Sequence, residues 1–276
     1  MSSDLYLVPF DFTEVSEKAV KYAVHLVELG GGKVLVTHVV DHKEEARIAK
    51  IKLEQKVHEF LSEENQKLVE LNISAGSIFN DIATTADATN ASLIVMGTHG
   101  AHGLQKILGS RSLKIVSSSG LPFLILNEQC NKTELNDIVM PFSFAKESVQ
   151  VAEFASSLAK KFDAKIHLVG YKDADEWLAR DMKTNEVVVR RHLAELGVEY
   201  ELVSIPSGSD YEEGLLNYAK EIDADLIAAA YFSHGIKDLF HKFIQEMIEN
   251  KHGIPVLTVN AVEVMAVNSG YSFITV

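Results

Sequence analysis

Between residues 93 and 110 the chain reads Leu93-Ile94-Val95-Met96-Gly97-Thr98-His99-Gly100-Ala101-His102-Gly103-Leu104-Gln105-Lys106-Ile107-Leu108-Gly109-Ser110. The apolar run at its start predicts a buried strand, and a helical pattern begins at Ser110. A strand, a glycine-rich loop and a helix N-terminus in this order can wrap backbone N–H groups around an anion. The stretch therefore predicts a candidate phosphate cradle.

The segments around this stretch alternate between strand and helix patterns, which is typical of a parallel sheet covered by helices on both faces. Thr13 is predicted to cap the first helix, and Gly30-Gly31-Gly32 to end it. One long helix is predicted from about residue 43 to 71. The other elements predicted in the first half are strands at 5–10, 33–40, 72–77, 92–96 and 121–126, and helices at 79–89 and 110–119.

The pattern then begins again. Val8-Pro9-Phe10-Asp11-Phe12 returns as Met140-Pro141-Phe142-Ser143-Phe144, and Gly120-Leu121-Pro122-Phe123-Leu124 returns as Gly253-Ile254-Pro255-Val256-Leu257. The two offsets, 132 and 133 residues, agree closely and indicate an internal repeat. We therefore expect two α/β domains, at residues 1–130 and 131–260.

Residues 261–276 lie outside the repeat. Two apolar segments there flank Asn268-Ser269-Gly270, which is a hairpin signal. The extension is either a strand pair at a sheet edge or a dimerisation arm.

Composition excludes several classes of protein. The chain has 276 residues and a formal charge of −13, which disfavours direct binding to nucleic acid. No apolar run approaches the ~18 residues of a membrane helix, and the N-terminus lacks the basic region of a signal peptide. With the single Cys130, which is either incidental or a redox thiol, these features predict a cytoplasmic protein. His99, His102, His234 and His241 lack accompanying ligands, so we expect no metal site.

The candidate site combines the ends of three predicted strands. Asp11 follows the first strand and the glycine-rich loop follows the fourth, so both face one crevice if these strands are neighbours at the switch point of the sheet. Asp11 then accepts hydrogen bonds from ribose hydroxyls, or alternatively it caps the first helix. The end of the second strand, Val39-Val40, can contact an adenine ring. Pro9, Met96 and His99 complete the predicted set.

These residues together resemble the universal stress protein family. The opening segment around Asp11, and Met96-Gly97-Thr98-His99-Gly100 with Gly109-Ser110, are similar to its opening turn and its ATP-binding signature, Gly-x2-Gly-x9-Gly-Ser/Thr. The resemblance covers nearly the whole chain. It implies two Rossmann-like sheets of strand order 3-2-1-4-5, paired through their last strands at 123–126 and 256–259, and a possible homodimer. It also implies binding of ATP, AMP or ADP, with or without Mg²⁺, in which Asp11 holds the ribose, Val40 the adenine, and Gly97, Gly100, Gly109 and Ser110 the phosphates.

The chain departs from this pattern in two places. Eight residues, 101–108, separate Gly100 from Gly109, whereas the signature has nine. A shift of one residue turns a helix start by about 100° and moves it ~1.5 Å. In the second half, Ser143 replaces Asp11, Ala230 and Ser233 replace Gly97 and Gly100, and Lys242-Phe243 replaces Gly109-Ser110. We therefore predict a nucleotide site in the first half only.

Three functions follow. The first is a stress-response module or switch that binds an adenine nucleotide. The second is a slow ATPase or autophosphorylating protein with Thr98, Ser110 or Ser112 as acceptor. The third is an interaction protein that no longer binds nucleotide. No general base is identified, and no catalytic residue is predicted.

Overall fold

The computed structural model describes residues 4–98, 113–142, 149–171, 176–205, 211–232 and 237–261. The chain divides into two compact units between Thr133 and Glu134, called unit 1 and unit 2 below. The predicted hairpin after residue 261 lies outside the described residues. Within the part of the chain that is described, no helix combines the length and apolarity that a membrane crossing requires.

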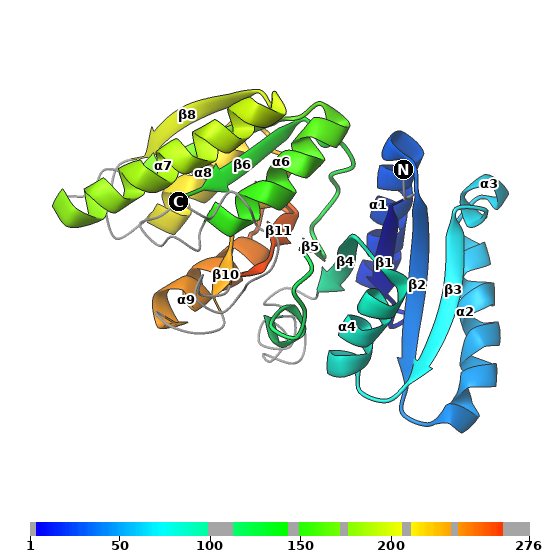
Figure 1. The fold of residues 1–276 in the computed structure, drawn as a ribbon. Coiled ribbons are helices and arrows are strands. Elements are labelled where there is room, and N and C mark those ends of the chain that lie inside the picture. The colour runs from blue at the N-terminus through cyan, green and yellow to red at the C-terminus, as the bar shows by residue number, and fades with distance from the viewer. Residues whose placement is uncertain are drawn as a thin grey trace. The chain divides into compact units, whose positions relative to one another are not determined.

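Unit 1 is a parallel sheet with helices packed against it, as predicted (Figure 1). Its strands lie in the order β3-β2-β1-β4-β5, so β1 is flanked by β2 and β4. Right-handed crossovers from β1 to β2 and from β2 to β3 place α1 and α2 on one face of the sheet. The crossover from β3 back to β4 places α4 on the other face. The elements are β1 (Leu5–Pro9), α1 (Glu14–Gly30), β2 (Lys33–Val40), α2 (Ala46–Phe60), α3 (Glu63–Gln66), β3 (Val69–Ala75), α4 (Ile78–Thr89), β4 (Leu93–Thr98) and β5 (Phe123–Asn127), with a 3-10 turn, η1 (Lys43–Glu45), before α2.

The ends of α1 are those that the sequence predicts. The Thr13 hydroxyl accepts a hydrogen bond from the backbone N–H of Ser16, which satisfies one of the free donors of the first turn. At the other end, Gly31 adopts a φ of 76°, in the region that favours glycine. The helix packs beside α2, and Glu17 on α1 forms an ion pair of 2.9 Å with Lys56 on α2.

The single long helix predicted for residues 43–71 is wrong. The helix ends at Phe60, because Leu61 adopts an extended conformation with φ −112° and ψ 142°. Ser62 then starts the short helix α3, and its side chain accepts a hydrogen bond from Asn65 N. Leu68 lies in the turn before β3, where its carbonyl accepts a hydrogen bond from Val34 N. The prediction overlooked the capping residue Ser62, because the helical spacing of the apolar residues continues past it.

Unit 2 has the same strand order, read as β8-β7-β6-β9-β11. A separate pair, β10 (Tyr231–Phe232) and β12 (Asn260–Ala261), adds a second small parallel sheet. The other elements are β6 (Asp137–Pro141), α6 (Gln150–Phe162), β7 (Lys165–Tyr171), α7 (Glu176–Leu196), β8 (Tyr200–Ile205), α8 (Tyr211–Glu221), β9 (Leu226–Ala228), α9 (Lys237–Ile248) and β11 (Val256–Thr258).

Backbone hydrogen bonds of the two units correspond at the offsets of the predicted repeat. The bond that follows the first strand and the bond that joins the last two strands occur in both units at nearly the same length. They are Phe10 N to Thr37 O, 2.9 Å, with Phe142 N to Val169 O, 3.0 Å, and Ile94 N to Pro122 O, 3.0 Å, with Ile227 N to Pro255 O, 2.9 Å.

Candidate functional site

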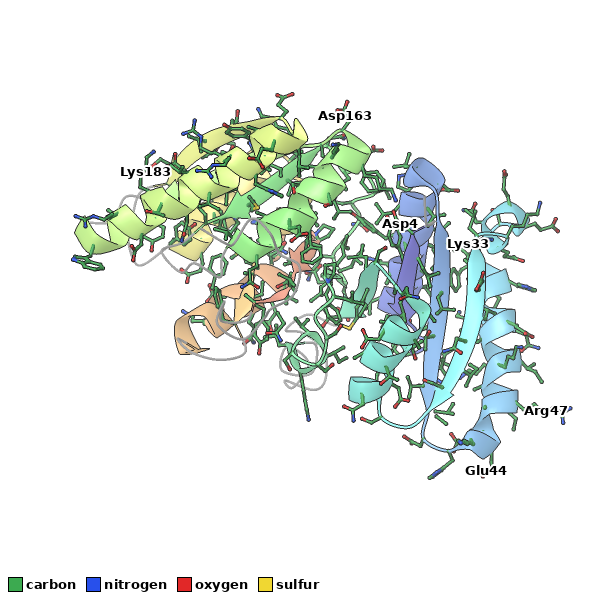
Figure 2. The ribbon with its side chains drawn as sticks, in the orientation of Figure 1. Asp4, Lys33, Glu44, Arg47, Asp163 and Lys183 are labelled. Atoms are coloured by element: carbon green, nitrogen blue, oxygen red, sulfur yellow. The ribbon has the colours of Figure 1, made fainter. Side chains whose placement is uncertain are left out.

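The strand order of unit 1 places its topological switch point between β1 and β4. The two strands pair directly, with Tyr6 opposite Leu93, and the chain leaves them toward opposite sides of the sheet. In such sheets the ligand crevice lies beyond the carboxyl ends of the strands at this point. Asp4 and Lys33 mark the amino end of the sheet, and Glu44 and Arg47 follow its carboxyl end (Figure 2). Pro9, Asp11, Met96 and Gly97 all belong to the carboxyl end.

Asp11 supports the cap of α1 and keeps one oxygen free. Its Oδ1 accepts hydrogen bonds from Thr13 N at 3.1 Å and from Thr13 Oγ1 at 2.5 Å. Thr13, and not Asp11, is the N-cap. The Asp11 side chain is exposed, and its Oδ2 accepts no hydrogen bond from the described residues. Asp11 therefore holds the N-cap residue Thr13 and does not itself cap α1, and its Oδ2 remains available to a ligand.

An aromatic and cationic cluster, which the sequence did not predict, lies beside this turn. It consists of Phe10, Phe12, His38 and Lys52. The Phe12 ring meets the His38 ring edge-on at 4.7 Å between centroids, and Lys52 Nζ lies 4.0 Å from the centre of the Phe12 ring. His38 Nδ1 donates to the carbonyl of Phe10 at 2.7 Å. The sequence carried no signal for this cluster, because its members come from the loop between β1 and α1, from β2 and from α2.

Gly97 has a packing role that its place in the glycine motif does not reveal. A Cβ atom on Gly97 would collide with Val15 O, and it would lie 2.7 Å from Val15 C and 3.0 Å from Ser16 N. All three atoms belong to the backbone at the start of α1. Only glycine therefore lets α1 approach β4 this closely. Met96, the residue before it, is buried.

Val40 ends β2 with its side chain buried and its backbone engaged in the sheet. Its carbonyl accepts a hydrogen bond from Gly76 N at 2.9 Å, beyond the last paired residue of β3. A carbonyl oxygen has two lone pairs, so one remains available to a further hydrogen-bond donor. The other predicted nucleotide-contacting residues, His99, Gly100, Gly109 and Ser110, lie outside the described residues. Residues 113–116 beyond them are helical.

The carboxyl end of unit 2 differs from that of unit 1. Pairing in β9 ends at Ala228, Ala230 is buried where unit 1 has Gly97, and Tyr231 and Phe232 form β10 with both side chains buried. Tyr211 and Phe243 stack with centroids 6.1 Å apart, and Tyr171 lies 4.8 Å from Tyr211. Burial raises the pKa of Tyr211 above its ordinary value. Aromatic side chains therefore gather at this end of the sheet. Ser143 and Ser233 lie outside the described residues.

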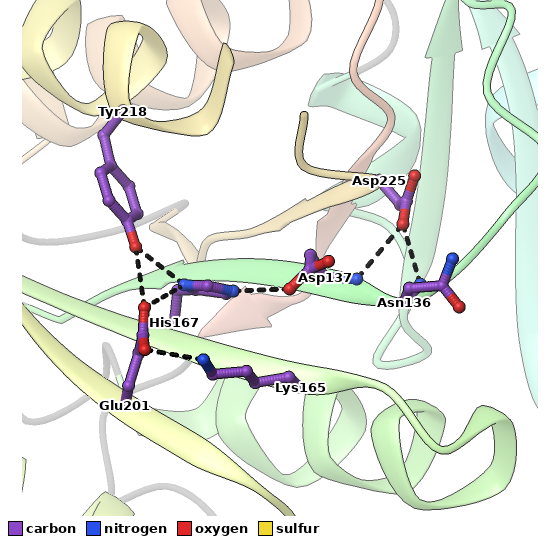
Figure 3. Close-up of polar contacts among 7 residues, drawn as sticks. All are labelled: Asn136, Asp137, Lys165, His167, Glu201, Tyr218 and Asp225. Atoms are coloured by element: carbon purple, nitrogen blue, oxygen red, sulfur yellow. Dashed lines mark hydrogen bonds and ion pairs between the residues drawn. The ribbon is translucent and has the colours of Figure 1, made fainter. Parts of the chain in front are cut away.

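A second cluster that the sequence did not predict lies at the opposite, amino end of unit 2 (Figure 3). The buried His167 places Nε2 2.7 Å from Asp137 Oδ1, and its Nδ1 lies 2.7 Å from Tyr218 Oη and 2.8 Å from Glu201 Oε1. Lys165 Nζ donates to Glu201 Oε2 at 2.7 Å. The hydrogen bond from Lys165, with the charges of His167 and Lys165, lowers the pKa of Glu201. Burial and the neighbouring Glu201 raise the pKa of Tyr218 to about 12. The residues of this cluster come from β6, β7, β8 and α8, so no local sequence motif predicts it.

Two further predictions concern reactive and metal-binding groups. Cys130 is buried, and burial raises the pKa of its thiol, which lowers its reactivity. Lys18 Nζ donates to the Cys130 carbonyl at 3.2 Å and ties this segment to α1. Over the described residues, no group of three or more His, Cys, Asp or Glu side chains is placed to hold a metal ion.

Similarity to known proteins agrees with the fold and with the motif of unit 1. Residues 6–127 match the model of the universal stress protein family. A universal stress protein of Methanocaldococcus jannaschii is 26% identical over 137 residues, which cover 44% of this chain and 81% of its own. Universal stress protein A homolog 1 of Coxiella burnetii is 28% identical over 127 residues, covering 40% and 86% of the two chains.

The whole chain also has the fold of a solved protein. The crystal structure of a universal stress protein from Archaeoglobus fulgidus aligns with a TM-score of 0.70 and 21% identity, over 95% of this chain and 100% of that one. That likeness concerns the fold of both units, whereas the sequence match concerns unit 1. Residues 6–127, within unit 1, therefore form a universal stress protein domain.

Proposed function

We propose that unit 1 binds an adenine nucleotide at the carboxyl ends of β1 and β4 and acts as a stress-response module or switch. The observation that carries the proposal is the Asp11 carboxylate. It stands exposed beside the switch point, with Oδ1 held by Thr13 and Oδ2 free of partners among the described residues. An ionised oxygen in that position suits the two hydroxyls of a ribose.

The proposed contacts extend from Asp11 along the crevice. The remaining lone pair of the Val40 carbonyl faces the adenine edge, and Pro9 and Met96 line the crevice. The phosphates of ATP, ADP or AMP, with any accompanying Mg²⁺, are assigned to the glycine-rich loop through Gly97, His99, Gly100, Gly109 and Ser110. Another universal stress protein has been solved in complex with cAMP, which is also an adenine nucleotide.

Residues 131–260, which include most of unit 2, are proposed to be a second domain of the same family that has lost this site. The matching strand order and backbone hydrogen bonds support common architecture. Ala230 adds a Cβ where unit 1 has Gly97, and the aromatic side chains of Tyr171, Tyr211 and Phe243 gather at the same end of the sheet. A chain with this arrangement binds one nucleotide.

Isothermal titration of the full chain with ATP and with ADP tests the proposal. We expect one nucleotide per chain, and Asp11→Ala should raise Kd at least tenfold, because hydrogen bonds to a charged acceptor contribute about 1.5–3 kcal/mol each. Ser143→Ala, at the corresponding position of unit 2, is the matched control and should leave Kd unchanged. Binding of two nucleotides, or an Asp11→Ala variant with the wild-type Kd, would contradict the assignment of the site.

A further inference from the structure

The backbone of Phe12 has an unusual conformation. Its φ is 66°, which lies in the left-handed region that phenylalanine rarely adopts because Cβ crowds the following carbonyl. Such a conformation persists only where the surroundings hold it. Phe12 stands between Asp11 and the N-cap Thr13, so its conformation determines how the Asp11 carboxylate meets Thr13.

The Phe12 side chain supplies the contacts that hold this turn. Its ring packs edge-on against His38 at 4.7 Å and against Phe10 at 5.3 Å between centroids. Lys52 Nζ lies over the ring at 4.0 Å, a distance suited to a cation–π interaction. His38 is itself fixed by its hydrogen bond to the Phe10 carbonyl. The ring is thus held by Phe10 in the loop after β1, by His38 on β2 and by Lys52 on α2.

We propose that Phe12 is a positioning residue for nucleotide binding: its ring, held by His38 and Lys52, maintains the left-handed turn that directs the Asp11 carboxylate toward the ribose. This inference rests on the proposed function. The turn fixes Oδ1 on Thr13 N and Thr13 Oγ1, and it leaves Oδ2 of this exposed residue without a hydrogen-bond partner among the described residues. A carboxylate fixed before binding loses less conformational freedom when the ligand arrives.

Unit 2 shows what the same end of the sheet looks like without this arrangement. The hydrogen bonds of Phe10 to Thr37 and of Phe142 to Val169 correspond, so Gly170 occupies the position of His38. Its missing side chain leaves space for the Phe142 ring, since a Cβ on Gly170 would lie 2.5 Å from Phe142 Cζ. Ser143 stands in place of Asp11. The histidine support and the carboxylate are therefore absent from unit 2 together.

The test uses the full chain with Phe12→Ala, Phe12→Gly, Lys52→Met and Asp11→Ala. Phe60→Leu is the matched control, since Phe60 stacks on Phe10 at 6.0 Å and, among the described residues, makes no ring contact with Phe12 itself. The first measurement is Kd for ATP and for 2′,3′-dideoxy-ATP, which lacks the ribose hydroxyls. Phe12→Ala should raise Kd for ATP about tenfold, by lowering the population of the competent turn, and leave Kd for the dideoxy analogue within about twofold. Phe12→Gly should fall between wild type and Phe12→Ala, because glycine accepts a φ of 66° without strain.

The second measurement needs no nucleotide. Hydrogen exchange of the Thr13 amide, which donates to Asp11 Oδ1, should accelerate at least tenfold in Phe12→Ala, as in Asp11→Ala, and not in Phe60→Leu. An unchanged Thr13 amide in Phe12→Ala would overturn the inference whether or not the protein binds ATP. A wild-type chain that binds no ATP, with Thr13 exchange accelerated as expected, would refute the proposed function but keep Phe12 as the residue that positions Asp11. Equal weakening of ATP and the dideoxy analogue would reduce Phe12 to a purely structural role.

Discussion

Gly97→Ala tests the packing of α1 on β4. The added Cβ would lie 2.7 Å from Val15 C and 3.0 Å from Ser16 N, and it would collide with Val15 O. Carbon atoms pack at about 3.5–4.0 Å, so α1 must move away from β4 by roughly 0.8 Å. Overpacking usually costs about 1–3 kcal/mol, and we expect about 2–3 kcal/mol because the obstructing atoms belong to backbone rather than to flexible side chains. For a domain of this size the loss corresponds to a decrease in Tm of roughly 6–12 °C.

The assay is urea and thermal unfolding of the full chain, followed by circular dichroism. Gly120→Ala is the control, because nothing lies within 4 Å of a Cβ built at that position of the same unit. It should change the free energy of unfolding by less than about 0.5 kcal/mol. If Gly97→Ala is equally mild but abolishes ATP binding, Gly97 serves the ligand and the packing argument is refuted.

Four further predictions concern the His167 cluster of unit 2 and Cys130. His167→Leu should lower the free energy of unfolding by about 1–3 kcal/mol, because Asp137 and Glu201 lose a partner. Adding Asp137→Leu should recover part of that loss. Denaturant unfolding measures both variants, and a double variant less stable than the single one would contradict the argument. The pKa of Glu201 is lower in the folded state than its unfolded value near 4.5, so ionised Glu201 stabilises the fold at pH values above 4.5. Stability should therefore fall as the pH drops below 4.5, and it should fall less steeply in Glu201→Gln. At alkaline pH, Tyr218 ionises near 10 when unfolded but at about 12 when folded, so stability should fall from pH 10 to 12; Tm measured against pH in wild type and Tyr218→Phe tests this. Cys130 should react with a thiol reagent slowly in the native protein and rapidly in urea, because its thiol is buried. Rapid labelling of the native protein would contradict this burial.

The helix caps show how far local sequence reaches. Thr13 and Gly31 end α1 as predicted, because their side chain or backbone freedom acts within a few residues. The break at Leu61 was missed although Ser62 is a capping residue, because the apolar spacing continued through it. Apolar periodicity reports which face is buried and does not report where one helix stops.

The candidate site divides in the same way. Asp11 is predicted from its place after the first strand and Gly97 from the glycine motif, and the structure places both at the switch point between β1 and β4. Phe12, His38 and Lys52 escaped prediction because a left-handed phenylalanine has no sequence signature and its supports are distant along the chain. The same holds for His167, whose partners lie 30 to 51 residues away.

By itself the sequence determined the alternation of strands and helices and predicted the internal repeat and the candidate loop, because hydrophobic periodicity and turn residues act locally. Only the tertiary structure decided what the individual residues do. It assigned Gly97 to the contact between α1 and β4, gave Asp11 one held and one free oxygen, and surrounded Phe12 with three separate elements. These roles depend on atoms that meet through packing of distant segments, and their separation along the chain hides them from any local pattern.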